Sequence, residues 1–260
     1  MIARLAASEH ADGWVLKGAL VLLVRLDHAA RATKDADTTW RYDAALLNDA
    51  LDDAAGCDLG DGFEFQIGSG SRIGAETGEG GWRYSVRALL DGRLFEQFIL
   101  DVNVSPDDPQ HPRPVDRLTL RRVLDFAGID PPTIAAVPVR FHLAEKLHAY
   151  VRIYAQARLS SRTKDLYDML VMARSLPLPA SDELHDAVTA TFELRATSLP
   201  TTLPVPPAQW QRTWAGYVRD YSIPWTNLDS AYAALEQLWA PVLAPPARPQ
   251  TWDVEEWTWR

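Results

Sequence analysis

The chain has 260 residues, of which 47 % are hydrophobic, and a formal net charge of −9. This composition suits one large domain or two modest ones, and its excess of acid excludes a broad, sequence-independent nucleic-acid coat, because binding phosphate depends on lysine and arginine. No apolar run is long enough to span a bilayer, the N-terminus lacks the apolar stretch of a signal peptide, and the one cysteine, Cys57, cannot form an internal disulfide, so we expect a cytoplasmic protein without membrane contact.

The first elements form a strand, a glycine turn and a helix. Residues 14–18 predict a short strand that ends at Gly18, and the apolar run 19–30 predicts a buried helix. Residues 31–42 alternate and are rich in β-branched and aromatic residues, which predicts a strand with Thr33, Asp35 and Asp37 on one face. Two interpretations are open for "TKDADTT": an acidic surface loop, or a metal site on a strand.

A helix and three antiparallel strands are expected next. Residues 43–57 have helical spacing, and strands are predicted at 63–69, 82–90 and 93–105, the last two joined by an Asp-Gly hairpin. The glycine-rich segment 68–81 is expected to be a turn, because no helix follows it. In the last strand Asp101 is an acid among strongly apolar neighbours.

The second half has a helical pattern. Beyond the proline-rich connection 105–114, helices are predicted around residues 117–127, 139–157, 163–175, 181–198, 207–220 and 227–242. We therefore expect an α+β domain over residues 1–112 and a helical domain over 113–260 that completes the active site. For the tail with Trp252, Trp257 and Trp259, docking onto the body is the first hypothesis and a partner interface the second.

The sign of the charge reverses in residues 140–164, where the acid Glu145 stands among six basic residues. This stretch is either a solvated helix face or a local contact for nucleic acid. The six are Arg140, Lys146, Arg152, Arg158, Arg162 and Lys164.

Several of these features suit phosphoryl transfer. The amides of the helix that opens at Gly18 favour an anion, and Asp35, Asp37 and Asp101 offer the hard oxygen ligands that magnesium prefers. With two metal ions, one activates the attacking hydroxyl and the other steadies the leaving group. Lys17 and Lys146 occupy positions from which a lysine can reach a shared cleft.

Two pairs of motifs carry a family resemblance. "LKGALVLLVRL" with "RATKDADTT", and "LAEKLHAYVR" with "SRTKDLYDML", resemble the AbiEii/MenT group of toxins in the polymerase-β-like nucleotidyltransferase superfamily. The departures are Ala19, where a second glycine or a serine is usual, and Ala36, which replaces a larger aliphatic residue between the acids. These motifs cover about a third of the chain.

The resemblance implies a mixed sheet flanked by helices and an enzyme that transfers a nucleoside monophosphate from an NTP to the 3′ acceptor end of tRNA. Asp35, Asp37 and Asp101 would be catalytic and hold Mg²⁺ or Mn²⁺, with Asp101 as third ligand or base. A cognate antitoxin is an expected partner. The remaining site residues are expected to be Lys17, Gly18, Thr33 and Asp165 for the nucleotide, Lys146 and Asp168 as the functional lysine and acid of the second motif pair, and Arg152, Arg158, Arg162 and Lys164 for the RNA.

Other functions stay open. The acceptor could instead be a protein side chain or a small molecule, which the acidic charge favours mildly. A catalytically silent nucleotide-binding module is a third hypothesis, and Ala19 is the residue in its favour. Lys146 with Asp165 and Asp168 could equally be a structural ion pair that joins two helices.

Overall fold

The computed structural model describes residues 1–26, 29–33, 35–73, 80–120, 130–152, 162–244 and 248–260. They form two compact units. The first comprises Met1–Asp27 and Ala32–Pro138, and the second comprises His28–Arg31 and Val139–Arg260. The boundary expected after residue 112 therefore differs from the observed division, since residues 113–138 belong to the first unit.

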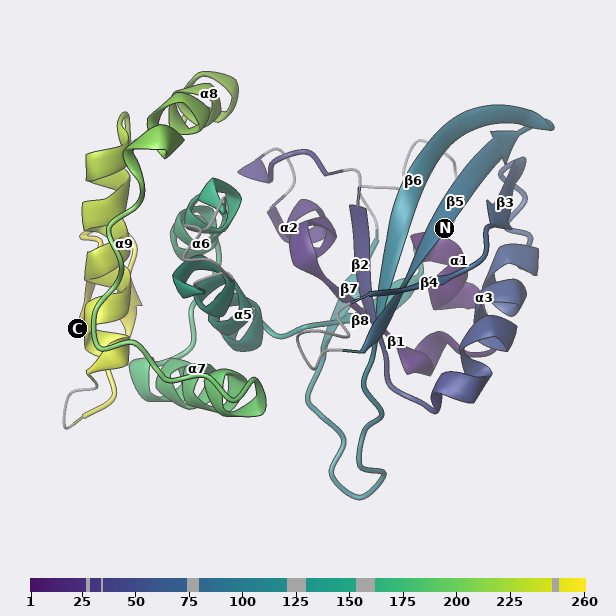
Figure 1. The fold of residues 1–260 in the computed structure, drawn as a ribbon, viewed down its shortest axis with the longest axis horizontal. Helices are drawn as coiled ribbons and strands as arrows, with labels where there is room; N and C mark the ends of the chain where they lie inside the picture. Colours follow the sequence, from purple (N-terminus) through teal and green to yellow (C-terminus); the bar gives the residue numbers. More distant parts are fainter. Residues whose placement is uncertain (27–28, 34, 74–79, 121–129, 153–161, 245–247) are drawn as a thin grey trace. The chain divides into compact units, whose positions relative to one another are not determined.

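The first unit is built on an eight-stranded sheet with the order β3-β5-β6-β2-β1-β8-β7, and β4 pairs with β5 (Figure 1). The pairs β1–β8 and β2–β6 are parallel, and the other pairs are antiparallel, so the expected mixed sheet is confirmed. The strands are β1 Trp14–Lys17, β2 Asp35–Trp40, β3 Phe63–Ile67, β4 Ser71–Ile73, β5 Gly81–Leu90, β6 Arg93–Val104, β7 Asp116–Thr119 and β8 Thr133–Ala136.

The strands β7 and β8 correct one prediction. A helix is expected over 117–127, but residues 117–119 lie in β7, and residues 121–129 fall outside the described part. The sequence does not predict β8, because TIAA is a short apolar run without alternation, as is typical of a buried strand paired in parallel. Because β8 pairs with β1 and β7 pairs with β8, these two strands extend the sheet beyond β1.

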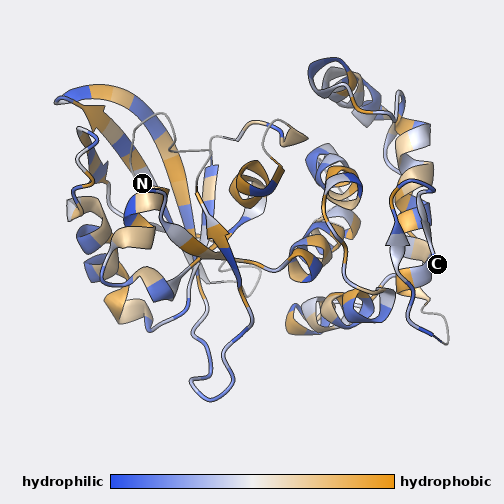
Figure 2. Ribbon diagram, turned by 180° about the vertical axis from the view of Figure 1, so that it is seen from behind, coloured by the Kyte–Doolittle hydropathy of each residue, from blue (hydrophilic) through white to orange (hydrophobic). Residues whose placement is uncertain are grey.

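Helices cover this sheet (Figure 1). Helix α2, Gly18–Leu26, contacts β2, and Figure 2 shows hydrophobic residues over most of it, in agreement with the sequence GALVLLVRL. Helix α3, Leu47–Gly56, follows a 3₁₀ turn over Ala44–Leu46 and packs on β3. The short helix α1, Ile2–Ala7, which the sequence pattern does not predict, packs on α3 and precedes a 3₁₀ turn over Ala11–Gly13.

Helix α1 carries a buried arginine. The Arg4 guanidinium donates to both carboxylate oxygens of Asp61, at 2.9 and 2.6 Å, and to the carbonyl oxygen of Phe63 at 2.7 Å. The hydrogen bonds from Arg4 and from the Phe63 amide lower the pKa of Asp61 to about 2. A buried arginine needs such a partner, so this pair links α1 to the loop before β3.

Strand alternation in β2 separates the core from the acidic side of the sheet. Ala36, Thr38 and Trp40 are buried, and Trp40 packs on Trp14 of β1 with ring centroids 4.7 Å apart. The alternate residues of β2, Asp35 and Asp37 among them, are exposed or half-buried. The same alternation buries Leu100 and Val102 of β6 and leaves Asp101 half-buried.

The β5–β6 hairpin turns at Asp91 and Gly92, whose φ values of 48° and 74° are those of the predicted Asp-Gly turn. A bulge lies opposite Ala88 and Leu89. Leu89 pairs with Leu94 but Ala88 pairs with Glu96, so Phe95 is an extra residue in β6. Beyond the bulge the register of the two strands is displaced by one residue.

The second unit is helical, as predicted. Its central helix is α6, Thr163–Ser175, in which every residue from Asp165 to Ala173 is buried. α6 contacts α5, α8 and α9, while α7 packs on α5 and α9. The other elements are α5 Val139–Val151, α7 Ser181–Leu194, a 3₁₀ turn over Ala208–Trp210, α8 Gln211–Tyr221, and α9 Leu228–Leu243, which Asn227 caps.

The tryptophan tail forms the short hairpin β9, Trp252–Asp253, and β10, Thr258–Trp259, within the second unit. Each of its indole N–H groups donates to a carbonyl of a helix: Trp252 to Ala173, Trp257 to Ala234 and Trp259 to Leu238. The tail therefore docks on α6 and α9, as the first hypothesis predicted. None of the helices in the described part of the chain has the length and apolar character that crossing a bilayer requires.

Candidate active site

The predicted acids of the first unit lie on adjacent strands. Asp37 of β2 is the register partner of Asp101 of β6, and Asp35 lies two residues before Asp37 on the same face. Neighbouring strands in a sheet are about 4.8 Å apart, so the three acids share one region of the sheet. We call Asp35, Asp37 and Asp101 the acid face.

Gly18 lies against this acid face. Its φ is +67°, and a Cβ placed on it would collide with the carboxylate of Asp37. Lys17 is the register partner of Asp37 on β1, and Gly18 is the first residue of α2. Only glycine brings the positive N-terminal end of a helix this close to the Asp37 side chain.

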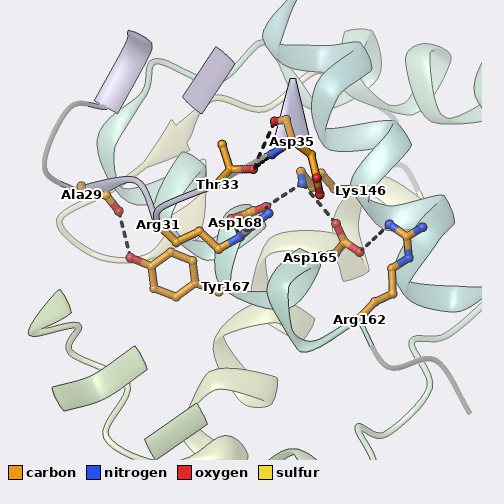
Figure 3. A network of polar contacts seen from close by, with 9 residues as sticks. All are labelled: Ala29, Arg31, Thr33, Asp35, Lys146, Arg162, Asp165, Tyr167 and Asp168. Atoms are coloured by element: carbon orange, nitrogen blue, oxygen red, sulfur yellow. Dashed lines mark hydrogen bonds and ion pairs between the residues drawn. The ribbon is translucent and has the colours of Figure 1, made fainter. Parts of the chain in front are cut away.

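Thr33 lies just before β2, which begins at Asp35, so its predicted place within the strand is wrong. Its hydroxyl is within 3.2 Å of both the amide nitrogen and the carbonyl oxygen of Asp35 (Figure 3). A threonine that bonds the main chain two residues on competes with strand pairing, which explains the late start of β2. The Thr33 hydroxyl thus fixes the backbone at Asp35, the first acid of the acid face.

Arg83 of β5 is not predicted as a site residue, yet it occupies the acid face. It is the register partner of Asp101 and donates from Nε and Nη2 to the two Asp101 carboxylate oxygens, at 2.8 and 2.7 Å. The hydrogen bonds and charge of Asp101 raise the pKa of Arg83, and the charges of Asp35 and Asp37 add to that effect. The guanidinium is therefore the direct counter-ion of Asp101, and its charge also acts on Asp35 and Asp37.

The sequence predicts a metal site formed by all three acids of the acid face. Within the described residues, no three or more His, Cys, Asp or Glu side chains gather in a way that could hold a metal ion. Asp35 and Asp37 nevertheless fit one ion, because magnesium is usually held by one or two carboxylates together with substrate phosphates. The absence of a side chain on Gly18, beside Asp37, is consistent with that fit.

In the second unit the predicted lysine and acids meet. The ammonium of Lys146 on α5 donates to Asp165 at 3.1 Å and to Asp168 at 2.6 Å, both on α6 (Figure 3). Burial would lower the pKa of Lys146, but the two carboxylates outweigh burial and raise it. The ion pair that the sequence offers as one interpretation is thus present.

Arg31 completes this cluster and is not predicted as a site residue, although it stands in the motif "RATKDADTT". It donates from Nε and Nη2 to the two oxygens of Asp168, at 3.0 and 3.1 Å. Burial opposes its charge, but Asp168 raises the pKa of Arg31 above its ordinary value. Two cations thus face the two buried acids Asp165 and Asp168, as burial of charge requires.

Tyrosines border the Lys146 cluster. Tyr167 donates from its hydroxyl to the Ala29 carbonyl oxygen at 2.8 Å, which ties the backbone at Ala29 to α6. The rings of Tyr217 and Tyr221 on α8 lie 4.8 and 5.4 Å from the Tyr167 ring. Burial raises the pKa of Tyr217, the charge of Arg31 opposes this shift, and the charge of Asp168 adds to it.

Two of the predicted RNA-binding residues, Arg162 and Lys164, lie at the start of α6. Arg162 is its N-cap and approaches Asp165 at 3.4 Å, and Lys164 is exposed on its first turn. Arg152, directly after α5, is half-buried. Arg158 lies outside the described residues.

Comparison with known proteins identifies the family. Residues 1–236 match the family described as "Nucleotidyl transferase AbiEii toxin, Type IV TA system". The chain belongs to this family. It is a toxin nucleotidyltransferase of a type IV toxin–antitoxin system, for which an NTP is the substrate and a cognate antitoxin the partner. Enzymes of this kind generally use a divalent metal ion.

Two solved structures are similar to this AbiEii chain. The nucleotidyltransferase toxin MenT4 from Mycobacterium tuberculosis H37Rv is 20 % identical, with 93 % of this chain and 84 % of MenT4 covered and a TM-score of 0.53. JHP933 from Helicobacter pylori is 15 % identical, with 94 % and 88 % covered and a TM-score of 0.46. No curated protein matches the chain. The likeness to MenT4 confirms the α+β nucleotidyltransferase toxin fold.

Proposed function

We propose that this AbiEii toxin transfers a nucleoside monophosphate from an NTP to the 3′ acceptor end of tRNA and thereby blocks translation. The oxygen of the terminal hydroxyl forms a bond to the α-phosphorus, the bond from that phosphorus to the β-phosphate oxygen breaks, and pyrophosphate leaves. The hydroxyl proton passes to a carboxylate or to water. The observation that carries the proposal is the acid face of β2 and β6 beside the start of α2.

Asp35 and Asp37 would hold the divalent ion, Mg²⁺ or Mn²⁺. When bound, such an ion supplies positive charge to the phosphates and lowers the proton affinity of the attacking hydroxyl. The half-exposed acid face suits this role, because a carboxylate that must meet both metal and substrate cannot be fully buried. Asp101 is the third acid of the face.

The start of α2 would bind the triphosphate. The first amides of a helix are available to an anion whatever the side chains there, so Ala19, which is buried, would leave this contribution intact. Lys17 adds a positive charge at the level of Asp37, and Thr33 holds the backbone of Asp35. These contacts argue against the catalytically silent module.

Lys146 is proposed to serve the same reaction through one N–H group. An ammonium has three donors, and Asp165 and Asp168 accept from it in the structure. The remaining donor suits a phosphate oxygen. Asp165 and Asp168 would then act as positioning residues, since an ionised carboxylate cannot itself bind a phosphate.

The tRNA backbone would contact Arg152, Arg158, Arg162 and Lys164. With a net charge of −9, the protein can bind RNA only through such a local group of basic residues. This contact would orient the acceptor end. It is expected to weaken steeply as the salt concentration rises.

The test incubates the purified protein with each α-labelled NTP, magnesium and total tRNA. Label should enter tRNA, and periodate oxidation of the tRNA, which destroys its terminal hydroxyls, should abolish the transfer. Asp37→Asn should lower the rate on the order of a hundredfold or more, whereas Asp49→Asn, at an exposed acid of α3, should not. Absence of label with all four NTPs, or full activity of Asp37→Asn, would contradict the proposal.

The same assay decides between acceptors. Label that survives ribonuclease and stays with protein or a small metabolite would indicate the alternative acceptor class. Periodate-treated tRNA that still accepts label would place the transfer elsewhere on the RNA. Either result keeps the nucleotidyltransferase and replaces the substrate.

A further inference from the structure

Four register partners cross the acid face in one row. Arg83 of β5 pairs with Asp101 of β6, Asp101 with Asp37 of β2, and Asp37 with Lys17 of β1. Register partners project from the same side of a sheet. The row therefore reads cation, acid, acid, cation, and each acid has a positive residue on its outer side.

The Arg83 guanidinium binds both carboxylate oxygens of Asp101. It donates one N–H to each carboxylate oxygen, and this bidentate pair is the strongest geometry open to arginine and a carboxylate. The Arg83 side chain is 51 % exposed, while that of Asp101 is 18 % exposed. Arg83 thus covers the Asp101 oxygens from the solvent side.

The pairing of Arg83 with Asp101 affects which acids of the face could bind a metal ion. Three ionised acids repel one another unless cations relieve them. The guanidinium occupies both carboxylate oxygens of Asp101, so that Asp35 and Asp37 are the acids of this face that would hold a divalent ion. Without Arg83, the third acid would be available to bind a second ion, as in enzymes that use two metal ions about 4 Å apart.

We propose that Arg83 is a positioning residue that keeps Asp101 out of metal coordination, so that the site takes one divalent ion per chain. The proposal rests on the metal-dependent function proposed above. It assigns Asp101 the role of anchoring Arg83 in place of the role of third ligand. It further requires that loss of Arg83 creates a second metal site.

The experiment counts bound Mn²⁺ by electron paramagnetic resonance. Wild-type protein, Arg83→Ala and the double variant Arg83→Ala/Asp101→Asn are titrated with Mn²⁺ alone and with α,β-methylene analogues of the four NTPs, and analogue-only blanks are subtracted. Two Mn²⁺ ions about 4 Å apart are spin-coupled, so the shape of the spectrum reports a close pair. Arg87→Ala is the matched control, because Arg87 lies on the same strand and bonds Gln66.

The expected counts are one ion for wild type and for Arg87→Ala, two coupled ions for Arg83→Ala, and one again for the double variant. A coupled pair in wild type, or a single ion in a folded Arg83→Ala protein, would overturn the inference. Circular dichroism establishes folding, which the exposed position of Arg83 favours. No Mn²⁺ binding by wild type would overturn both the inference and the metal-dependent function.

Label transfer separates the two proposals. Wild-type protein that transfers label while Arg83→Ala still binds one ion leaves the proposed function standing and removes the inference. If wild-type protein transfers no label but all variants bind ions in the expected counts, the inference about Arg83 stands and the proposed function is removed.

Discussion

The ammonium nitrogen of Lys146 lies 2.6 Å from a carboxylate oxygen of Asp168, and both residues are buried. Because α5 and α6 contribute one partner each, this ion pair joins two helices of the second unit. Its stability depends on every charge keeping a partner, and Arg31 and Asp165 complete the balance.

Lys146→Ala is expected to destabilise the second unit by about 3 kcal/mol, because it removes from the two buried carboxylates Asp165 and Asp168 the cation that they share. Urea unfolding followed by tryptophan fluorescence measures the change. Lys164→Ala, at an exposed position of α6, is the control and should alter stability by less than about 0.5 kcal/mol. Equal stability of the two variants would show that the buried pair contributes nothing net.

The Arg4–Asp61 pair predicts acid sensitivity of the first unit. The pKa of Asp61 is lowered from 3.8 to about 2 in the folded protein, so the folded state binds fewer protons than the unfolded state in this interval. The contribution of Asp61 is fully present above pH 3.8 and is lost as the pH falls through about 2. Asp61→Asn should flatten the dependence of the unfolding midpoint on pH in this window, and an unchanged slope would refute the assignment.

Gly18→Ala should abolish transfer while costing only about 1–2 kcal/mol of backbone strain. The added Cβ meets the Asp37 carboxylate and must displace it from the acid face. Gly60→Ala supplies the comparison, since Gly60 has a similar φ of +70° and an added Cβ there would meet nothing within 4 Å. Label-transfer rates beside thermal unfolding separate the two effects, and equal activity of both variants would count against the close approach.

Trp259→Ala is expected to destabilise the second unit by about 3–5 kcal/mol, because it empties a buried site and removes the hydrogen bond to Leu238. Val254→Ala, in the exposed turn of the same hairpin, should have little effect. Unfolding in urea tests both variants. A small loss for Trp259→Ala would favour the alternative that the tail serves a partner.

Much of the fold follows from local signals. α6 begins and ends at the predicted residues 163 and 175, because its pattern is long and Ser175 precedes a proline-containing segment. The turn at Asp91 and Gly92 is equally predictable, because an Asp-Gly pair is a strong hairpin signal. β7 and β8 are not, since a strand of four residues carries little periodicity and the pairing of β8 with β1 joins distant parts of the sequence.

The candidate site is only partly predictable for the same reason. Asp35, Asp37, Lys146 and Asp168 stand in motifs, so the motifs alone indicate them. Arg31 stands in a motif too, but its contact with Asp168 depends on residues 28–31 belonging to the second unit. Arg83 has no motif, and only the register of β5 on β6 brings it to Asp101.

That register makes the two strands of the hairpin unequal in their tolerance of lost residues. Deletion of Phe95 would remove the bulge and leave Arg83 opposite Asp101, because Phe95 has no partner on β5. Deletion of Arg87 from β5 would instead advance the pairing by one residue and bring Trp82 opposite Asp101. An indole would then replace the guanidinium beside the acids. In an AbiEii toxin built this way, the electrostatics of the site can thus change through the length of β5 without substitution of any site residue.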